Sequence, residues 1–401
     1  MTQSYWWQRE DLCYRKGKLT YCDKDVETLA DALETPLYLY SAARIKRNLT
    51  SLHDALNYND VRHTIYYAMK ANRFAPLLTY LKVTGLCGID ACSPAEVKLA
   101  LSCGFSQREI SYTATSMSDQ DADLLAQWPD VLVNCDSISA IRKIGKRCSG
   151  RSIGLRINPA RGVGYHNLSV LQYSGKKATK FGIYREHFEE ALHVARECEL
   201  AVNRIHFHTG CGYLNDQLYQ LEEIFEAATW FTARIPELHQ VNLGGGLGVP
   251  HTETDAQLDL RTWGRLVQKY FGSHHVAIEP GDYIVKDSGL LLLEIASVER
   301  KQDTLFVGVN GGFNLAIEPA FYQRPKEAVL CKQPGSTEKI ETTIAGNINE
   351  ALDIWAERIP FPRCEEGQRI AFLNAGGYAS SMSSNHCLRG QFSEYLLIDR
   401  E

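Results

Sequence analysis

The chain has 401 residues, of which 44% are hydrophobic and 23% are charged, and its formal net charge is −5. This length allows a large buried core and suits one large domain with a smaller one, and the composition is typical of a soluble globular protein. Because no basic block is present, nucleic acid and anionic membranes are not expected as partners. No apolar run approaches membrane-spanning length, and the first residues lack the features of a signal peptide.

The twelve cysteines are scattered along the chain, and none forms a Cys-x-x-Cys pair. A zinc ribbon or a thioredoxin-type site is therefore not expected, and no metal site is predicted. We expect most of the cysteines to be reduced and buried, and we expect the protein in the cytoplasm.

From about residue 36 to 285, short β-rich runs alternate with amphipathic helical patterns. The predicted strands are 37–40, 64–69, 152–157, 204–208, 240–243 and 276–278. Helices are predicted at 188–195 and 218–228, where apolar residues recur on one face. This alternation predicts an α/β fold built on a β/α (TIM-like) barrel, with a doubly wound open sheet as the alternative.

After about residue 286 the helical patterns become sparse and β-rich segments take their place. The predicted strands in this part are 290–296, 304–309, 342–344 and 369–373. The change predicts a separate C-terminal β domain.

Lys70 follows the apolar, β-prone run 64–69 and is followed closely by Asn72. A strand that ends there would hold the ammonium at the rim of a sheet or barrel. A desolvated amine in that position can lose its proton and become a nucleophile. The alternative is an ordinary lysine that closes a strand.

His206 and His208 stand at alternate positions of a predicted strand and therefore share one face. They fit a metal pair, an imidazole stacked on a cofactor ring, or histidines of the core. A metal site needs more ligands, and the sequence offers no convincing partner motif.

Gly244, Gly245 and Gly246 follow a predicted strand, and consecutive glycines let backbone N–H groups approach a phosphate. Glu279 ends the next predicted strand, where a carboxylate that faces a pyridine nitrogen would keep that ring protonated. A tight turn and a surface glutamate are the alternatives.

These motifs, in this order, resemble the fold-type III pyridoxal-phosphate decarboxylases, the family of diaminopimelate, ornithine and arginine decarboxylases. The resemblance runs over nearly the whole chain. It implies that residues 36–285 form a barrel that binds pyridoxal 5'-phosphate. It also implies that residues 1–35 complete a β domain of residues 286–401, and that a homodimer shares active sites across a head-to-tail interface.

The resemblance also implies a role for each matching residue. Lys70 matches the lysine that forms the Schiff base, and Glu279 matches the partner of the pyridine nitrogen. His208 matches the histidine that stacks on the ring, and Tyr378 matches the tyrosine that reaches the phosphate. The other residues implied to bind the cofactor are Asp90, Arg156, Cys211, Gly244, Gly245, Gly246 and Gly281.

The chain departs from the family pattern at three motifs. Asn349, beside Glu350, replaces a cysteine that reaches in from the partner subunit and helps to direct protonation, and these two residues are predicted to be catalytic. An amide cannot give up a proton at ordinary pH. Asp282 replaces an arginine that commonly faces the phosphate or the substrate, and Glu318 replaces an arginine that would grip a distal carboxylate of diaminopimelate.

The departures bear on the substrate. The reversed charge at Glu318 turns an attraction into a repulsion and argues against free diaminopimelate. Glu318, Glu350 and Asp353 favour a cationic distal group, as in ornithine or lysine, and Tyr322 is the other predicted substrate-binding residue.

An amino acid that is acylated at its far end is the second candidate substrate. Relatives in siderophore assembly act on compounds such as citryl-ornithine, and the candidate anion partners here are Arg324, Lys326 and Arg389. We predict a pyridoxal-phosphate-dependent decarboxylase, a lyase of amino-acid metabolism, with no metal. Two other classes stay open: a catalytically inactive regulator, and a metal-dependent barrel hydrolase that uses His206 and His208.

Overall fold

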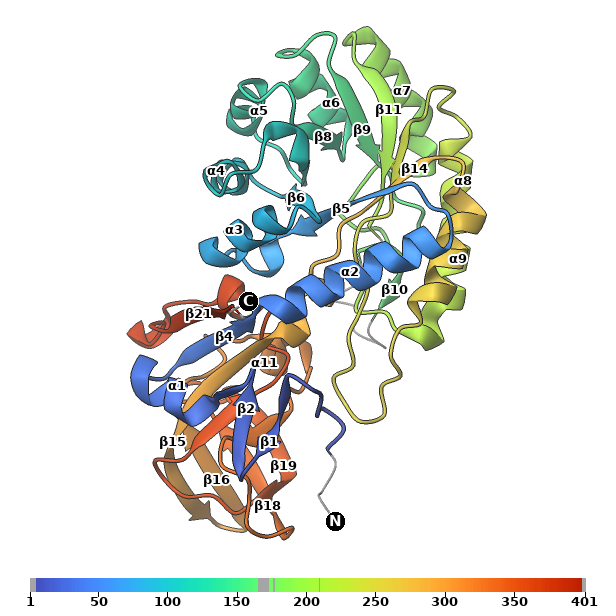
Figure 1. Ribbon diagram of the computed structural model, residues 1–401. Coiled ribbons are helices and arrows are strands. Elements are labelled where there is room, and N and C mark those ends of the chain that lie inside the picture. Colours follow the sequence, from blue (N-terminus) through green and yellow to red (C-terminus); the bar gives the residue numbers. More distant parts are fainter. Residues whose placement is uncertain (1–4, 165–172, 176, 209, 399–401) are drawn as a thin grey trace. The chain divides into compact units, whose positions relative to one another are not determined.

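The structure is a computed structural model that describes residues 5–164, 173–175, 177–208 and 210–398 (Figure 1). The chain divides into two compact units. The barrel unit comprises Lys46–Val249 and Ala256–Ile284, and the β unit comprises Met1–Ile45, Pro250–Asp255 and Val285–Glu401.

Eight parallel strands of the barrel unit close into a barrel in the order β11-β13-β14-β5-β6-β7-β8-β9. These strands are β5 (His63–Ala68), β6 (Gly88–Ala91), β7 (Ile110–Ala114), β8 (Leu132–Cys135), β9 (Ser152–Arg156), β11 (Ala201–His206), β13 (Gln240–Asn242) and β14 (His275–Ile278). The closure of the sheet confirms the predicted β/α barrel, and the open-sheet alternative is wrong.

The helices of this unit lie outside the strands and cover the barrel (Figure 1). They are α2 (Ala42–Tyr58, which begins in the β unit), α3 (Ala75–Thr84), α4 (Pro94–Ser102), α5 (Asp119–Ala126), α6 (Ile138–Gly145), α7 (Phe188–Glu197), α8 (Leu218–Thr232), α9 (Leu260–Phe271) and the short α10 (Asp282–Val285). The two predicted helices correspond to α7 and α8, each of which buries its apolar face.

The parallel strands carry their carboxyl ends to one rim of the barrel, which is where this fold places its functional groups. In register, Arg156 of β9 pairs with His206 of β11, and His206 pairs with Asn242 of β13. A two-stranded parallel ribbon of β10 (Val163–Gly164) and β12 (Gly210–Cys211) continues beyond this rim.

The β unit contains an eight-stranded sheet and a separate three-stranded sheet. The large sheet consists of β4 (Leu37–Ser41), β15 (Gly289–Lys301), β16 (Thr304–Val309), β17 (Ala328–Leu330), β18 (Lys339–Ala345), β19 (Ile354–Pro362), β20 (Arg369–Phe372) and β21 (Ser393–Leu397). The small sheet consists of β1 (Leu12–Arg15), β2 (Lys18–Tyr21) and β3 (Lys24–Asp25), and the helices of the unit are α1 (Val26–Leu33) and α11 (Glu318–Tyr322).

The N-terminal segment shares a hydrophobic core with the C-terminal sheet, as in Leu19 and Tyr21 against Leu290 and Leu292. The β domain is therefore completed by the N-terminal segment, as predicted. The predicted placement of strand 37–40 in the barrel is wrong, because β4 pairs with β15 and β21. Its five consecutive buried residues look like a barrel strand, and only the pairing partner distinguishes the two.

All twelve cysteines are free, but only Cys22, Cys87, Cys135 and Cys331 are buried, so the expectation that most of them are buried is wrong. Among the described residues, no helix combines the length and the apolar character needed to cross a membrane.

Candidate active site

Lys70 lies in the single turn Met69–Ala71 that follows β5, at the carboxyl-terminal rim of the barrel. Its Nζ lies 4.0 Å from Oδ2 of Asp90 and 3.8 Å from Sγ of Cys92. The Lys70 side chain is 41% exposed, whereas that of Asp90 is only 2% exposed. An accessible amine thus stands beside a buried carboxylate.

The neighbours of Lys70 hold its pKa above the ordinary value, because the Cys92 thiol and the Asp90 carboxylate outweigh the opposite effect of burial. Burial raises the pKa of Cys92 to about 12, so this thiol is neutral at pH 7 and Asp90 is the partner that matters. The charge of Asp90 therefore opposes the deprotonation that desolvation of Lys70 would bring. Burial and the charge of Glu279 raise the pKa of Asp90, which makes it a suitable acceptor for the Lys70 proton.

Glu279 follows β14 and is held by three buried side chains from β7, β11 and β13. Its Oε1 accepts hydrogen bonds from Ser111 Oγ at 3.0 Å and Asn242 Nδ2 at 2.6 Å, and its Oε2 lies 2.8 Å from His206 Nε2. Burial opposes the charged form, but His206, Lys70 and Asn242 outweigh it and lower the pKa of Glu279 to about 2. The site therefore holds a fixed carboxylate that is charged at neutral pH.

The two histidines of the predicted pair do different things. His206 contacts Glu279, whereas Nδ1 of His208 accepts a hydrogen bond from Gly245 N–H at 3.2 Å. Burial and the nearby cations Lys70 and Arg156 lower the pKa of His208 well below its usual range, so its imidazole is neutral. Tyr173 packs edge-on against the His208 ring, with centroids 4.6 Å apart.

The three glycines form a loop that side chains could not occupy. Gly244 has a φ of +67°, and a Cβ there would lie 2.5 Å from Phe207 O. A Cβ on Gly245 would overlap Glu279 O, and one on Gly246, with φ +105°, would lie 2.8 Å from Gly210 O. The loop is thus pressed against Glu279 and the β10–β12 ribbon, and Gly244 and Gly245 are buried.

The remaining predicted cofactor residues of the barrel unit surround the same rim. Arg156 is buried at the end of β9, with its guanidinium 4.7 Å from the Phe181 ring centre. Cys211 lies in β12, next to the Gly210 that contacts the glycine loop. Gly281 follows Pro280, whose carbonyl accepts a hydrogen bond from Ala68 N–H at 3.3 Å.

Tyr378 and Glu318 belong to the β unit. Glu318 is buried between two lysines: Oε1 pairs with Lys286 Nζ, and Oε2 pairs with Lys326 Nζ at 2.7 Å. Burial disfavours the charged form of Glu318, yet the two ammonium groups lower its pKa to about 2. Glu318 therefore has a structural role that its predicted role in substrate binding did not anticipate.

The loop 347–350 in the β unit carries the predicted catalytic residues Asn349 and Glu350, both exposed. Oε1 of Glu350 lies 3.4 Å from His386 Nε2. Asp353 is 3% exposed, and its two oxygens accept hydrogen bonds from the backbone N–H groups of Phe313 and Ile348, each at 2.6 Å. Asp353 thus anchors this loop, which is a different role from the predicted substrate contact. Tyr322 ends α11.

Two of the residues that hold the site together, Ser111 and Asn242, were absent from the predicted set. Ser111 is the second residue of β7, Asn242 is the last residue of β13, and both are buried. A buried polar side chain inside a barrel needs a hydrogen-bond partner, but the sequence alone does not show that these two residues are buried or that Glu279 is their partner.

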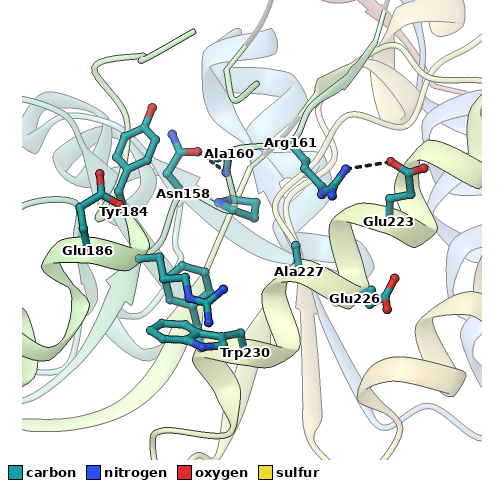
Figure 2. Close-up of a pocket in the computed structure, with 12 residues that line it drawn as sticks. Asn158, Ala160, Arg161, Tyr184, Glu186, Glu223, Glu226, Ala227 and Trp230 are labelled. Atoms are coloured by element: carbon teal, nitrogen blue, oxygen red, sulfur yellow. Dashed lines mark hydrogen bonds and ion pairs between the residues drawn. The ribbon is translucent and has the colours of Figure 1, made fainter. Parts of the chain in front are cut away.

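A pocket of about 570 Å³ lies elsewhere on the barrel unit, between α8 and the loop that follows β9 (Figure 2). An ion pair joins Arg161 and Glu223 at 3.1 Å, and the guanidinium of Arg185 lies 4.2 Å from the Trp230 ring centre. None of the predicted site residues lines this pocket. Among the described residues, no group of three or more His, Cys, Asp or Glu side chains could hold a metal ion.

The rim fits pyridoxal phosphate by the chemistry of its groups. It offers an amine at Lys70, a charged carboxylate at Glu279, a neutral flat imidazole at His208 and a glycine loop with no room for side chains. Oδ1 of Asp90 is buried and has no hydrogen-bond partner in the described part of the chain. These are the groups that would bind a formyl carbon, a pyridine nitrogen, an aromatic ring and a phosphate.

Comparison with known proteins identifies the family of the chain. Residues 42–286 match the family model of the pyridoxal-dependent decarboxylase, pyridoxal binding domain. The chain is 31% identical over 395 residues to a diaminopimelate decarboxylase of Methanothermobacter thermautotrophicus, covering 95% of this chain and 91% of that protein. It is 28% identical to the enzyme of the same name from Streptomyces coelicolor, covering 92% and 85%.

Solved structures share the fold. The diaminopimelate decarboxylase of M. jannaschii in complex with L-lysine superposes with a TM-score of 0.87 at 23% identity, covering 97% of this chain and 93% of that chain. The arginine decarboxylase of Paramecium bursaria Chlorella virus superposes with a TM-score of 0.80 at 18% identity, covering 93% and 99%. The chain therefore belongs to the pyridoxal-dependent decarboxylase family and is a pyridoxal-phosphate-dependent amino-acid decarboxylase.

Proposed function

We propose that this decarboxylase removes the α-carboxylate of a diamino acid whose distal amine is acylated by a carboxylate-bearing group, as in citryl-ornithine of siderophore assembly. The observation that carries the proposal is the pairing of Glu318 with both Lys286 and Lys326. The three buried charges sum to +1. The acid that replaces the family arginine is therefore not available to attract a cationic distal group.

The other acids that favoured a cationic distal group also have partners within the protein. Asp353 binds backbone N–H groups, and only Glu350 is exposed with a long contact to His386. This weakens the case for free ornithine or lysine. It also weakens the argument against diaminopimelate. That argument assumed a negative charge at Glu318, whereas the summed charge of Lys286, Glu318 and Lys326 is positive. Diaminopimelate is the second candidate, since the relatives named above act on it by name.

Each residue of the rim has a separate proposed role in the reaction. When bound, pyridoxal phosphate draws electrons from the substrate's α-carbon and so allows the carboxylate to leave. Glu279 would keep the pyridine nitrogen protonated, and His208 would hold the ring flat. Lys70 would hold the cofactor until the substrate's amine takes its place, with Asp90 accepting the ammonium proton.

Lys70 is also the proposed proton donor to the α-carbon after carbon dioxide has left. Its amine is then free and takes up a proton readily, because its neighbours favour the ammonium. Asn349 cannot serve as a donor, because an amide does not ionise at ordinary pH. Its proposed role is a hydrogen bond to the substrate.

We further propose a cytoplasmic homodimer in which the loop with Asn349 and Glu350 enters the partner's site. In its support, Glu350 and the 44%-exposed Leu352 line a surface pocket of about 560 Å³ on the β unit. Mixing inactive Lys70→Ala with inactive Glu350→Gln subunits should restore about a quarter of the activity, since one site per mixed dimer is intact. No recovery on mixing would contradict shared sites.

The substrate assignment is tested by carbon dioxide release from the protein with pyridoxal phosphate. The panel contains ornithine, lysine, diaminopimelate, Nδ-succinyl-ornithine and Nδ-citryl-ornithine, and Lys70→Ala is the blank. We expect kcat/KM for the acylated compounds to exceed that for ornithine at least a hundredfold. A preference for ornithine or lysine would overturn the acylated assignment, and a preference for diaminopimelate would select the second candidate.

A further inference from the structure

The buried cluster of Lys286, Glu318 and Lys326 contacts one segment of backbone, Asn374–Tyr378. Lys326 Nζ donates to the carbonyl of Asn374 at 2.8 Å, and Lys286 Nζ donates to the carbonyl of Gly377 at 3.2 Å. The Lys286 ammonium also lies 5.5 Å from the centre of the Tyr378 ring. All these residues belong to the β unit.

The segment they hold has an uncommon backbone. Asn374 has a φ of +54° and Tyr378 has a φ of +55°. Both lie in the left-handed region, which residues other than glycine rarely adopt. Between them, Gly376 packs so closely on the 285–286 backbone that a Cβ would overlap Val285 O. Such a conformation persists only where the surroundings determine it.

The backbone around the segment adds further constraints. Gly376 N–H donates to the carbonyl of Lys286 at 3.0 Å, and Ala375 N–H donates to the carbonyl of Gly289 at 2.9 Å. The side chain of Asn374 donates to the carbonyl of Pro250 at 2.9 Å. Lys286 thus binds the segment twice, once through its ammonium and once through its own carbonyl.

The free-energy cost of burying the three charges indicates that the cluster has a role beyond packing. Lys286 and Lys326 are 0% and 1% exposed and Glu318 is 6% exposed, and burying three charges is expensive relative to apolar side chains of similar size. Fully paired buried charges fix one arrangement of the groups around them. Here those groups are the carbonyls on either side of Gly376.

We propose that Lys286, Glu318 and Lys326 are positioning residues that fix the conformation of Asn374–Tyr378 and thereby orient the Tyr378 hydroxyl toward the cofactor phosphate. Glu318 holds the two ammonium groups apart, and each ammonium holds one end of the segment. The inference rests on the proposed function and on the role that the family resemblance implies for Tyr378, which is to bind the phosphate.

The test is the affinity of the cofactor-free protein for pyridoxal phosphate, measured as a Kd by fluorescence titration. The melting temperature of each variant is measured alongside. Tyr378→Phe should raise the Kd about tenfold, since it removes one hydrogen bond to a charged group. Lys326→Met should raise the Kd by a similar factor. The double variant should be no weaker than either single variant, because both changes remove the same contact.

Arg44→Met is the matched control. Arg44 forms an ion pair with Asp287 in the same unit, is 16% exposed, and makes no contact with the segment. It should lower the melting temperature and leave the Kd unchanged.

Should Lys326→Met not fold, Lys326→Arg and Lys286→Arg keep the buried charge. Each should still raise the Kd, because a guanidinium does not reproduce the ammonium's contacts.

A wild-type Kd in Lys326→Met, or effects that multiply in the double variant, would overturn the proposal. So would a wild-type Kd in Tyr378→Phe. Failure of the proposed function is a separate result: the wild-type protein would bind pyridoxal phosphate normally and release no carbon dioxide from any compound of the panel.

Discussion

Glu279 illustrates how single residues set the chemistry of this site. A buried carboxylate alone would favour its neutral form, but His206, Lys70 and Asn242 reverse that tendency and hold its pKa at about 2. A charged group that is fixed before the cofactor arrives needs no reorganisation during the reaction. Its counterpart Lys70 is held as an ammonium by Asp90.

Glu279→Gln removes the charge and keeps the size of the side chain. We expect kcat to fall at least a hundredfold, about 2.7 kcal/mol, because the pyridine nitrogen loses the group that keeps it protonated. Cofactor affinity should change less than tenfold. Glu109→Gln is the control, since Glu109 pairs with Lys82 on the surface of the barrel unit. Turnover of Glu279→Gln within threefold of wild type would refute this role of the carboxylate.

The roles of Glu318 and Asp353 show why single residues were the hardest part to predict. Both were predicted to bind the substrate, because an acid at these positions would favour a cationic ligand. Lys286 and Lys326 lie 32 and 8 residues from Glu318, so only the fold reveals that they neutralise it. Lys70 and Glu279 were predicted because each follows a predicted strand, and His208 because it alternates with His206 along one.

At the scale of elements, the sequence predicted part of the strands and helices and missed others, including the fully buried barrel strands β6 and β7. The predicted strand 304–309 coincides with β16. Strand β19 was missed, because its residues do not alternate between buried and exposed. β4 was found but placed in the wrong sheet, since local pattern does not specify a pairing partner.

The glycine loop after β13 gives a prediction at this scale. In Gly245→Ala the new Cβ overlaps Glu279 O, so the loop must move away from the rim. We expect the Kd for pyridoxal phosphate to rise more than tenfold, measured by fluorescence titration. Gly335→Ala is the matched control, because no atom lies within 4 Å of a Cβ there. Equal affinities of the two variants would show that the loop does not bind the phosphate.

At the scale of the whole molecule, buried titratable groups make stability depend on pH. Burial lowers the pKa of His208 well below its usual range and that of His251 to about 3. Their native forms bind fewer protons than the unfolded chain below pH 6.5, so stability falls as pH drops from 6.5 toward 3. Glu279 and Glu318, with pKa values lowered to about 2, add a loss between pH 4.5 and 2. Asp90 acts in the opposite direction, because its pKa is raised.

We therefore expect urea denaturation to show a free energy of unfolding that declines below pH 6.5, by about 1.4 kcal/mol per pH unit for each such histidine. His251→Asn should reduce the slope of the free energy of unfolding against pH by the contribution of one histidine. His193→Gln, at an exposed position, should leave the slope unchanged. A slope in His251→Asn equal to that of wild type would show that His251 is not buried in its neutral form.

The central claim is that Lys70 is the amine that binds pyridoxal phosphate. Reduction of the cofactor-loaded protein with borohydride, followed by peptide mass mapping, tests this directly. The account predicts one phosphopyridoxyl group per chain, on the peptide that contains Lys70. A group on Lys180, Lys286 or another lysine, or no modification at all, would contradict it.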